Sequence, residues 1–256
     1  MRVVAVIPAR LSASRFPRKP LALIHGRPMI EHVYRRTRWC RELDEVYVAT
    51  CDREIFDATV AFGGKAVMTS DTHVRASDRV AEVARDLDTD VVLMVQGDEP
   101  MIQPSMIEAA LRPLREDPTV QCVNLAAPIT TEEELGDRNT IKVVFAENGD
   151  ALFFSREAIP TRQQLGFTGI PAYKQVCVIP FRRQTLLEYA SMAQTPLERA
   201  ESVDMLRLLE NGCPVRMVVT DAQTHAVDSP ADIATVEALL VTDPALPRFL
   251  SEAGKR

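Results

Sequence analysis

A short polar loop near the amino terminus gathers positive charge and hydroxyl groups directly after an apolar run. The apolar run, residues 3–7, predicts a buried parallel strand, and ligands of open α/β sheets bind beyond the carboxyl ends of such strands. Guanidinium and ammonium groups suit the oxygens of a polyphosphate. The loop, residues 7–20, therefore predicts a nucleotide triphosphate site, against the alternative of a solvated basic loop. Its cations and hydroxyls are Arg10, Ser12, Ser14, Arg15, Arg18 and Lys19.

Two carboxylates suit a hard metal ion. Asp98 follows the most apolar run of the chain, residues 90–96, within the sequence Gln96-Gly97-Asp98-Glu99-Pro100. Mg²⁺ usually takes one or two carboxylates together with substrate phosphates. Asp228, just before the last expected helix, is a candidate second ligand that converges with Asp98. The alternatives are a plain strand-to-helix turn at Asp98 and a helix N-cap at Asp228.

A third polar segment, residues 72–79, leads into an expected helix. Arg75 lies in the loop, and Arg79 near the helix start is placed to reach a ligand over that loop. The alternative is an exposed helix start. Nucleotidyl transfer needs positioning, cations and a metal rather than a protein nucleophile. The chain shows neither a Walker A sequence nor a GxGxxG fingerprint, so the nucleotide site is of another kind.

The composition excludes several classes of protein. The chain of 256 residues is 46% hydrophobic and 26% charged, which is ordinary for a globular protein. Its net charge of -6 argues against nonspecific binding of nucleic acid polymers. The five cysteines form no CxxC pair, which argues against a zinc site or a disulfide framework. No signal-type or membrane-length segment is evident, so we expect a cytoplasmic protein without a membrane partner.

The elements that must position these residues alternate in the first half of the chain. We expect helices at residues 29–40, 52–62, 77–87 and 104–114, and strands at 3–7, 45–50, 65–68 and 90–96. We expect later strands at residues 120–128, 141–146, 151–155, 173–180 and 215–220, and later helices at 181–190, 196–209 and 230–240. This order predicts an α/β fold of doubly wound type. We expect one domain over residues 1–242, with a loop or arm at 156–174, and a loose tail over 243–256.

The motifs together resemble the sugar-activating cytidylyltransferases, above all the family that couples CTP to 3-deoxy-manno-octulosonate (Kdo). The resemblance extends from about residue 4 to 240. It implies a Rossmann-like nucleotide-transferase fold, a mixed and mostly parallel sheet with helices on both faces, and a dimerisation arm within residues 120–190. The matching segments are IPARLSASRFPRKPLALIHGRPMI (7–30), MVQGDEPMI (94–102), NTIKVVF (139–145), ALFFSREAIP (151–160), PLERAE (196–201) and SPAD (229–232).

The resemblance also implies a reaction and roles for individual residues. An acceptor oxygen attacks the α-phosphate of CTP and releases pyrophosphate, with Mg²⁺ as cofactor and a homodimer as the assembly. Arg10 and Lys19 would bind the triphosphate, and Asp98 and Asp228 would hold Mg²⁺. The further residues expected to bind or position the ligands are Ser14, Arg15, Arg75, Arg79, Gln96, Gln175 and Glu198.

Several positions depart from the family pattern on the acceptor side. Gln175 stands where the family has His, Ile179 and Phe181 where it has Tyr, and Met205 where it has Gln. Losing such hydrogen-bonding groups reduces affinity for a polyhydroxylated sugar. Arg75, at a position where the family has Ser, adds a cation on the acceptor side. We therefore prefer a small anionic acceptor, a phosphonate such as phosphonoformate, with Kdo or a related sugar acid as the alternative.

Two hypotheses come from other classes of protein. A metal-dependent glycosyltransferase usually carries an Asp-x-Asp pair at the metal, whereas this strand ends in Gly97-Asp98-Glu99. A non-catalytic nucleotide-binding regulator would keep the basic loop without paired metal carboxylates. The presence of both Asp98 and Asp228 favours an enzyme.

Overall fold

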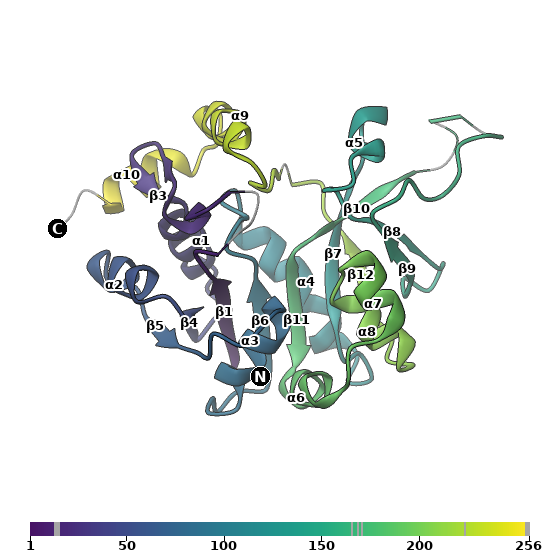
Figure 1. Cartoon of the computed structure of the whole chain (residues 1–256), viewed down its shortest axis with the longest axis horizontal. Helices are drawn as coiled ribbons and strands as arrows, with labels where there is room; N and C mark the ends of the chain where they lie inside the picture. The colour runs from purple at the N-terminus through teal and green to yellow at the C-terminus, as the bar shows by residue number, and fades with distance from the viewer. Residues whose placement is uncertain (13–15, 165, 168, 170, 223, 254–256) are drawn as a thin grey trace.

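A mostly parallel five-stranded sheet forms one side of the molecule (Figure 1). The computed structural model describes residues 1–12, 16–164, 166, 167, 169, 171–222 and 224–253. The strand order is β11-β6-β1-β4-β5, with β11 antiparallel to β6 and the other neighbours parallel. The strands are β1 (Val3–Ala9), β4 (Glu45–Thr50), β5 (Ala66–Met68), β6 (Val91–Val95) and β11 (Val178–Arg182). The α/β class expected from the sequence is confirmed.

The apolar run of β1 is buried on both faces because helices cover both sides of the sheet. Val3, Ala5 and Ile7 belong to one core cluster, with residues of α1 and α4. Val4 and Val6 belong to the opposite cluster, with residues of α3 and α6. This explains the absence of polar alternation in β1. The helices are α1 (Met29–Arg38), α2 (Arg53–Ala61), α3 (Ala76–Ala84), α4 (Pro104–Glu116) and α6 (Arg183–Ser191).

A second five-stranded sheet lies beside the first, in the order β12-β7-β10-β8-β9. An isolated bridge between Cys122 and Phe181 joins the two sheets. The hairpin β8–β9 turns at Gly149, whose φ of 85° suits glycine. The strands are β7 (Val123–Pro128), β8 (Lys142–Phe145), β9 (Ala151–Ser155), β10 (Tyr173–Val176) and β12 (Arg216–Val219).

Two elements that the sequence predicts as continuous are broken. The strand expected at 173–180 is two strands, β10 and β11, which belong to different sheets and meet at Cys177. The helix expected at 196–209 is two helices, α7 (Pro196–Glu201) and α8 (Met205–Glu210), separated at Ser202 with a φ of 56°. Unpredicted short elements are η1 (Lys19–Leu21), β2 (Leu23–Ile24), β3 (Arg27–Pro28) and α5 (Glu132–Gly136).

The carboxyl-terminal segment is not the loose tail that we expected. After α9 (Pro230–Val241), residues Leu246–Ala253 form α10. Phe249 of α10 is fully buried and stacks on His32 of α1, with ring centroids 3.8 Å apart. The indole of Trp39 donates a hydrogen bond to Glu252. The buried ring of Phe249 and the hydrogen bond from Trp39 therefore hold this helix against α1.

The expected arm leaves β9 and returns at β10, and Figure 1 shows its described part projecting from the second sheet. Residues 165, 168 and 170 of this segment lie outside the described residues. The single-domain boundaries and the dimerising role of the arm stay predictions. Within the part of the chain described, no helix has the length and apolar character needed to cross a membrane.

Candidate active site

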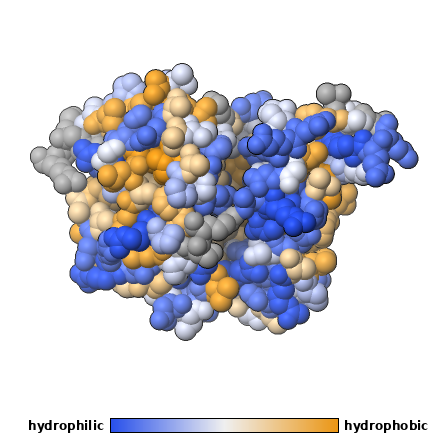
Figure 2. Space-filling model, turned by 45° about the horizontal axis from the view of Figure 1, so that its top comes forward, coloured by the Kyte–Doolittle hydropathy of each residue, from blue (hydrophilic) through white to orange (hydrophobic). Residues whose placement is uncertain are grey.

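Two adjoining cavities open where the carboxyl ends of β1 and β6 face the second sheet. Their volumes are about 760 and 560 Å³. Figure 2 shows a hollow near the middle of this face, with hydrophilic side chains along one rim. Because both cavities share part of their lining, two ligands bound in them would meet there. The polar residues that line both cavities are Arg75, Gln96, Asp98, Arg156 and Asp228.

The basic loop contributes to the smaller cavity. Arg10 and Lys19 line it, as the sequence predicts for a triphosphate site. Arg18 is not among the described lining residues, because it adopts a left-handed backbone and pairs with Glu54 of α2. The predicted Ser14 and Arg15 lie outside the described residues. Of the three described cations of the loop, two therefore line the cavity.

Lys19 joins the basic loop to Asp98 and to the residue that precedes Asp228. Its Nζ donates to Asp98 Oδ2 and to the carbonyl oxygen of Val227, each at 2.7 Å. The Val227 amide in turn donates to the Asp98 carbonyl at 3.0 Å. These contacts hold Asp98 beside the segment that carries Asp228. Asp98 and Asp228 both line the two cavities, as expected for carboxylates that converge.

Asp228 is not the cap of α9. Ser229 caps this helix through a capping box with Asp232, and the Asp228 amide also donates to Asp232 Oδ2 at 2.9 Å. The Asp228 side chain therefore lines the cavities for a reason other than capping. Two carboxylates beside a cationic loop fit Mg²⁺ that completes its coordination with substrate oxygens. No group of three or more His, Cys, Asp or Glu side chains that could hold a metal ion occurs among the described residues.

Arg79 is a buried cation rather than an exposed helix start. It is 3% exposed and lines the smaller cavity. One guanidinium nitrogen, Nη1, donates to Thr69 Oγ1 and to the Ser70 carbonyl. The other, Nη2, is buried and finds no hydrogen-bond partner among the described residues. A buried charged donor left in this state suits an anionic ligand.

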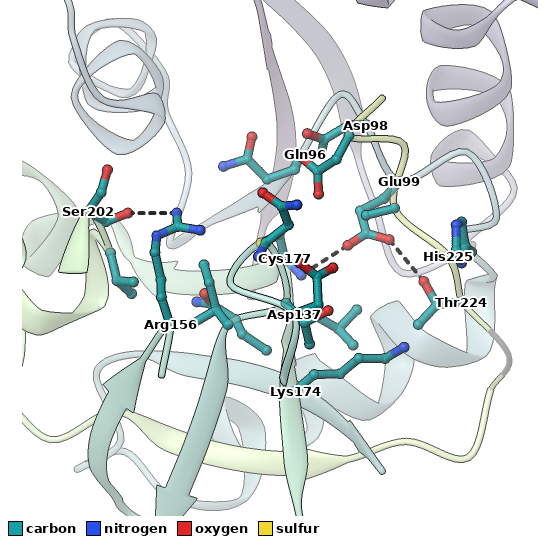
Figure 3. A pocket seen from close by; sticks show the side chains of 18 of the residues that line it. Gln96, Asp98, Glu99, Asp137, Arg156, Lys174, Cys177, Ser202, Thr224 and His225 are labelled. Atoms are coloured by element: carbon teal, nitrogen blue, oxygen red, sulfur yellow. Dashed lines mark hydrogen bonds between the residues drawn. The ribbon is translucent and has the colours of Figure 1, made fainter. Parts of the chain in front are cut away.

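Glu99 is buried in the wall of the larger cavity. Its carboxylate accepts hydrogen bonds from the Cys177 amide at 3.4 Å and from Thr224 Oγ1 at 2.9 Å (Figure 3). Burial, assisted by the nearby charge of Asp98, raises the pKa of Glu99 to about 7. Sequence reasoning placed Glu99 in a motif but gave it no role. The break at Cys177 that brings this amide to Glu99 could not be seen in the alternation of residues.

Arg75 lines both cavities, but its charge is already opposed. Its guanidinium donates to Ser202 Oγ at 2.7 Å and lies 3.5 Å from Glu198 and 3.8 Å from Asp204. The added cation on which we based a preference for a small anion is therefore largely neutralised by the protein. This weakens the case for a phosphonate acceptor.

Glu198 does not reach either cavity. It is fully buried, and Arg207 binds both its carboxylate oxygens, at 2.8 and 2.6 Å. Its side chain also closes the capping box of α7 with Thr195. The direct ligand contact expected of Glu198 is therefore wrong for this conformation. It supports Arg75 from behind the cavity wall.

The larger cavity contains Gln175 as expected, and two cations that we did not single out. The Gln175 amide donates to Asn124 Oδ1 at 2.6 Å, and Lys174 pairs with Glu134. Arg156 donates to the carbonyl oxygens of residues 138, 201 and 202, and it forms no ion pair with a described residue. The ALFFSREAIP motif contains Arg156, so the motif was the signal that could have found it.

Carboxylates outnumber cations in the larger cavity. Its cationic side chains are those of Arg75, Lys174 and Arg156, and the first two are paired with carboxylates. Asp98, Glu134 and Asp204 are themselves paired with cations, so the excess of negative charge comes from the other carboxylates. These repel a small multiply charged anion and accept hydrogen bonds from hydroxyl groups. The acidic lining residues are Asp98, Glu99, Glu133, Glu134, Asp137, Asp204, Asp228 and Asp232.

Residues 4–221 match the sequence model of the family described as cytidylyltransferase. A 3-deoxy-manno-octulosonate cytidylyltransferase from Syntrophotalea carbinolica is 43% identical over 247 residues, which cover 94% of this chain and 99% of that protein. A protein of the same name from Myxococcus xanthus is 45% identical over 240 residues, covering 93% and 96% respectively.

Two solved structures are also similar to this chain. A CMP:2-keto-3-deoxy-manno-octonic acid synthetase complexed with CTP superposes with a TM-score of 0.88 at 38% identity, covering 95% of this chain and 100% of that chain. A 4-diphosphocytidyl-2C-methyl-D-erythritol synthase from Anaerococcus prevotii superposes with a TM-score of 0.64 at 15% identity, covering 94% and 98%. The second likeness shows the fold alone.

Proposed function

This chain belongs to the cytidylyltransferase family, and we propose that it transfers CMP from CTP to 3-deoxy-manno-octulosonate or a closely related sugar acid, with release of pyrophosphate. The relatives over nearly the whole chain carry the name of the Kdo enzyme. They favour the sugar acid, which we held as the alternative, over phosphonoformate. The observation in this chain that carries the proposal is the acid-rich lining of the larger cavity.

The charges in this cavity suit a hydroxylated monoacid better than a small phosphonate. Sugar hydroxyl groups would donate to exposed lining carboxylates such as Glu133 and Asp137, whereas a phosphonate would be repelled by them. Arg156, which has no described ion-pair partner, suits the single carboxylate of the acceptor.

We place the phosphates in the smaller cavity because three of its lining residues are cations suited to them. Arg10, Lys19 and Arg79 would hold them there, and the acceptor in the larger cavity would approach across the wall that both cavities share. An acceptor oxygen attacks the α-phosphorus, the bond to the β-phosphate oxygen breaks, and pyrophosphate leaves. Asp98 and Asp228 would hold Mg²⁺, which when bound neutralises phosphate charge. Lys19 keeps Asp98 oriented through its contact with Oδ2.

Pyrophosphate release tests this proposal. The purified protein is incubated with CTP and Mg²⁺, with Kdo and phosphonoformate as parallel acceptors, and with EDTA as the control for the metal. We expect release with Kdo and Mg²⁺ and none with EDTA. Release with phosphonoformate alone would restore the phosphonate hypothesis. Release in the presence of EDTA would show that the reaction does not require a metal ion.

The homodimer remains a separate proposal that rests on the resemblance. The segment between β9 and β10 is the expected contact, since it projects from the second sheet (Figure 1). Light scattering coupled to size-exclusion chromatography measures the mass directly. A mass near 28.5 kDa would show a monomer and contradict it.

A further inference from the structure

Lys142 is a fully buried lysine that binds only to backbone oxygens among its described partners. It is 0% exposed, and its Nζ donates to the carbonyl oxygens of Asp137 at 2.8 Å, Thr140 at 2.7 Å and Arg156 at 2.5 Å. No carboxylate of a described residue forms an ion pair with it, and burial lowers the pKa of Lys142. Burying an ammonium group is costly, so its three hydrogen bonds must be well formed.

All three residues that Lys142 binds line the larger cavity. They come from two separate segments, the turn before β8 and the residue after β9. In the hairpin, Lys142 is paired with Ser155, so its neighbour across the sheet directly precedes Arg156. One ammonium group therefore fixes two segments of the cavity wall relative to each other.

A second charged side chain holds Arg156 from its other side. Glu201 Oε2 accepts the Arg156 amide at 2.8 Å, and Glu201 Oε1 accepts Ser155 Oγ at 3.0 Å. The backbone N–H and C=O of Arg156 are thus both bound by charged side chains, Glu201 and Lys142. The Arg156 Nε also donates to the Glu201 carbonyl at 2.7 Å. This arrangement restricts the position from which the guanidinium can reach a ligand.

We propose that Lys142 and Glu201 are positioning residues that set acceptor affinity by clamping the backbone of Arg156. The inference rests on the proposed function, in which Arg156 binds the carboxylate of the acceptor. It gives a shared role to Lys142 of the NTIKVVF motif and Glu201 of the PLERAE motif, which phosphate binding does not explain. A binding group must be held to within about 0.5 Å, and a clamp on both sides of its peptide achieves this.

Lys142→Met tests the clamp because it keeps the chain length and removes the ammonium group. The matched control is Lys65→Met, since Lys65 is an exposed lysine paired with Glu45 far from the cavities. We expect Lys142→Met to raise the KM for Kdo roughly tenfold to hundredfold. The KM for CTP should change less than about twofold, because none of the hydrogen bonds of Lys142 to described residues reaches the basic loop. Glu201→Gln should act in the same direction with a smaller effect.

A double-mutant cycle separates positioning from a general structural role. If Lys142 acts through Arg156, adding Lys142→Met to Arg156→Met should raise the KM for Kdo little further. Additive effects would overturn the proposal. So would a loss of kcat with both KM values unchanged, since that indicates a smaller folded fraction.

Hydrogen exchange measured by mass spectrometry tests the clamp independently of the acceptor. We expect the peptide that contains Arg156 to exchange faster in Lys142→Met than in the unmutated protein, with β5 unchanged as an internal control. If the unmutated protein releases no pyrophosphate with Kdo, the proposed function fails while this exchange difference still supports the clamp. Equal exchange of the Arg156 peptide in both proteins would overturn the clamp, whatever the acceptor.

Discussion

His32 should make the folded protein sensitive to acid. The side chain is fully buried, its Nε2 lies 2.8 Å from the Ile24 carbonyl, and its ring stacks on Phe249 of α10. The contact with a carbonyl places the proton on Nε2, and Nδ1 is buried with no partner among the described residues. Burial, with a smaller contribution from Arg36, lowers the pKa of His32 from 6.5 to about 3. The folded protein therefore keeps this ring neutral where an exposed histidine would be charged.

The sign of the effect follows from the two pKa values of His32. Above pH 6.5 the ring is neutral in both the folded and the unfolded chain, so it adds no pH dependence. Between pH 6.5 and 3 the unfolded chain binds a proton that the folded chain does not. The free energy of unfolding then falls by about 1.4 kcal/mol for each pH unit. From pH 7 to pH 5 the loss from this residue amounts to about 2 kcal/mol.

Urea unfolding at several pH values measures this loss, with His32→Gln as the comparison. The variant lacks the titrating ring, so its free energy of unfolding should fall about 2 kcal/mol less between pH 7 and pH 5. The comparison uses the slopes with pH, so an overall destabilisation of the variant does not matter. Equal slopes, or a pKa of His32 near 6.5 in an NMR titration of the folded protein, would refute the reasoning. Deleting residues 246–256 should raise the pKa of His32, because Phe249 no longer covers the ring.

The remaining predictions concern the site. Asp98→Asn should lower kcat roughly hundredfold or more with Mg²⁺ while leaving the unfolding midpoint nearly unchanged; near-normal turnover would exclude Asp98 as a metal ligand. Lys19→Met should raise the KM for CTP roughly tenfold, because it removes a phosphate-binding cation; an unaltered KM in pyrophosphate-release kinetics would place Lys19 outside the site. Arg75→Ser should raise the KM for the acceptor more than the KM for CTP. An effect on CTP alone would assign Arg75 to the nucleotide.

The fold could be predicted from the sequence where a single physical signal decides an element. The unbroken apolar runs of β1 and β6 predict buried parallel strands, and both lie at the centre of the parallel sheet. The strands at Glu45–Thr50 and Ala151–Ser155 have the expected bounds. The helix at the carboxyl terminus was missed although Leu246, Phe249 and Leu250 recur at helical spacing; what the spacing does not reveal is the contact of Phe249 with His32.

The charged residues of the site could be predicted from the sequence, but their contacts with other residues could not. The basic loop and Asp98 stood out because their types and positions suit phosphate and metal. The breaks at Cys177 and Ser202 were missed, since both continue a pattern of apolar residues that reads as one element. Each break serves the site: Cys177 offers its amide to Glu99, and Ser202 accepts a hydrogen bond from Arg75. Glu198, placed in the site by motif alone, pairs instead with Arg207.

The departures from the family pattern argue less strongly against a sugar acceptor once their positions in the structure are known. Phe181, which stands where the family has Tyr, is fully buried in the core and is not among the described lining residues of the larger cavity. Gln175, Ile179 and Met205 do line that cavity, so some hydrogen-bonding groups are lost there.

Other residues supply polar groups to the same cavity, among them Glu99, Asp137, Thr140 and Thr224. Counting only the altered family positions therefore underestimates how polar the cavity is. An anion with few hydroxyl groups would offer these polar groups few hydrogen bonds and would face the negative charge of the lining carboxylates. A sugar acid supplies hydroxyl donors to this polar lining and one negative charge for Arg156, and for this reason we propose such an acceptor despite the lost tyrosines.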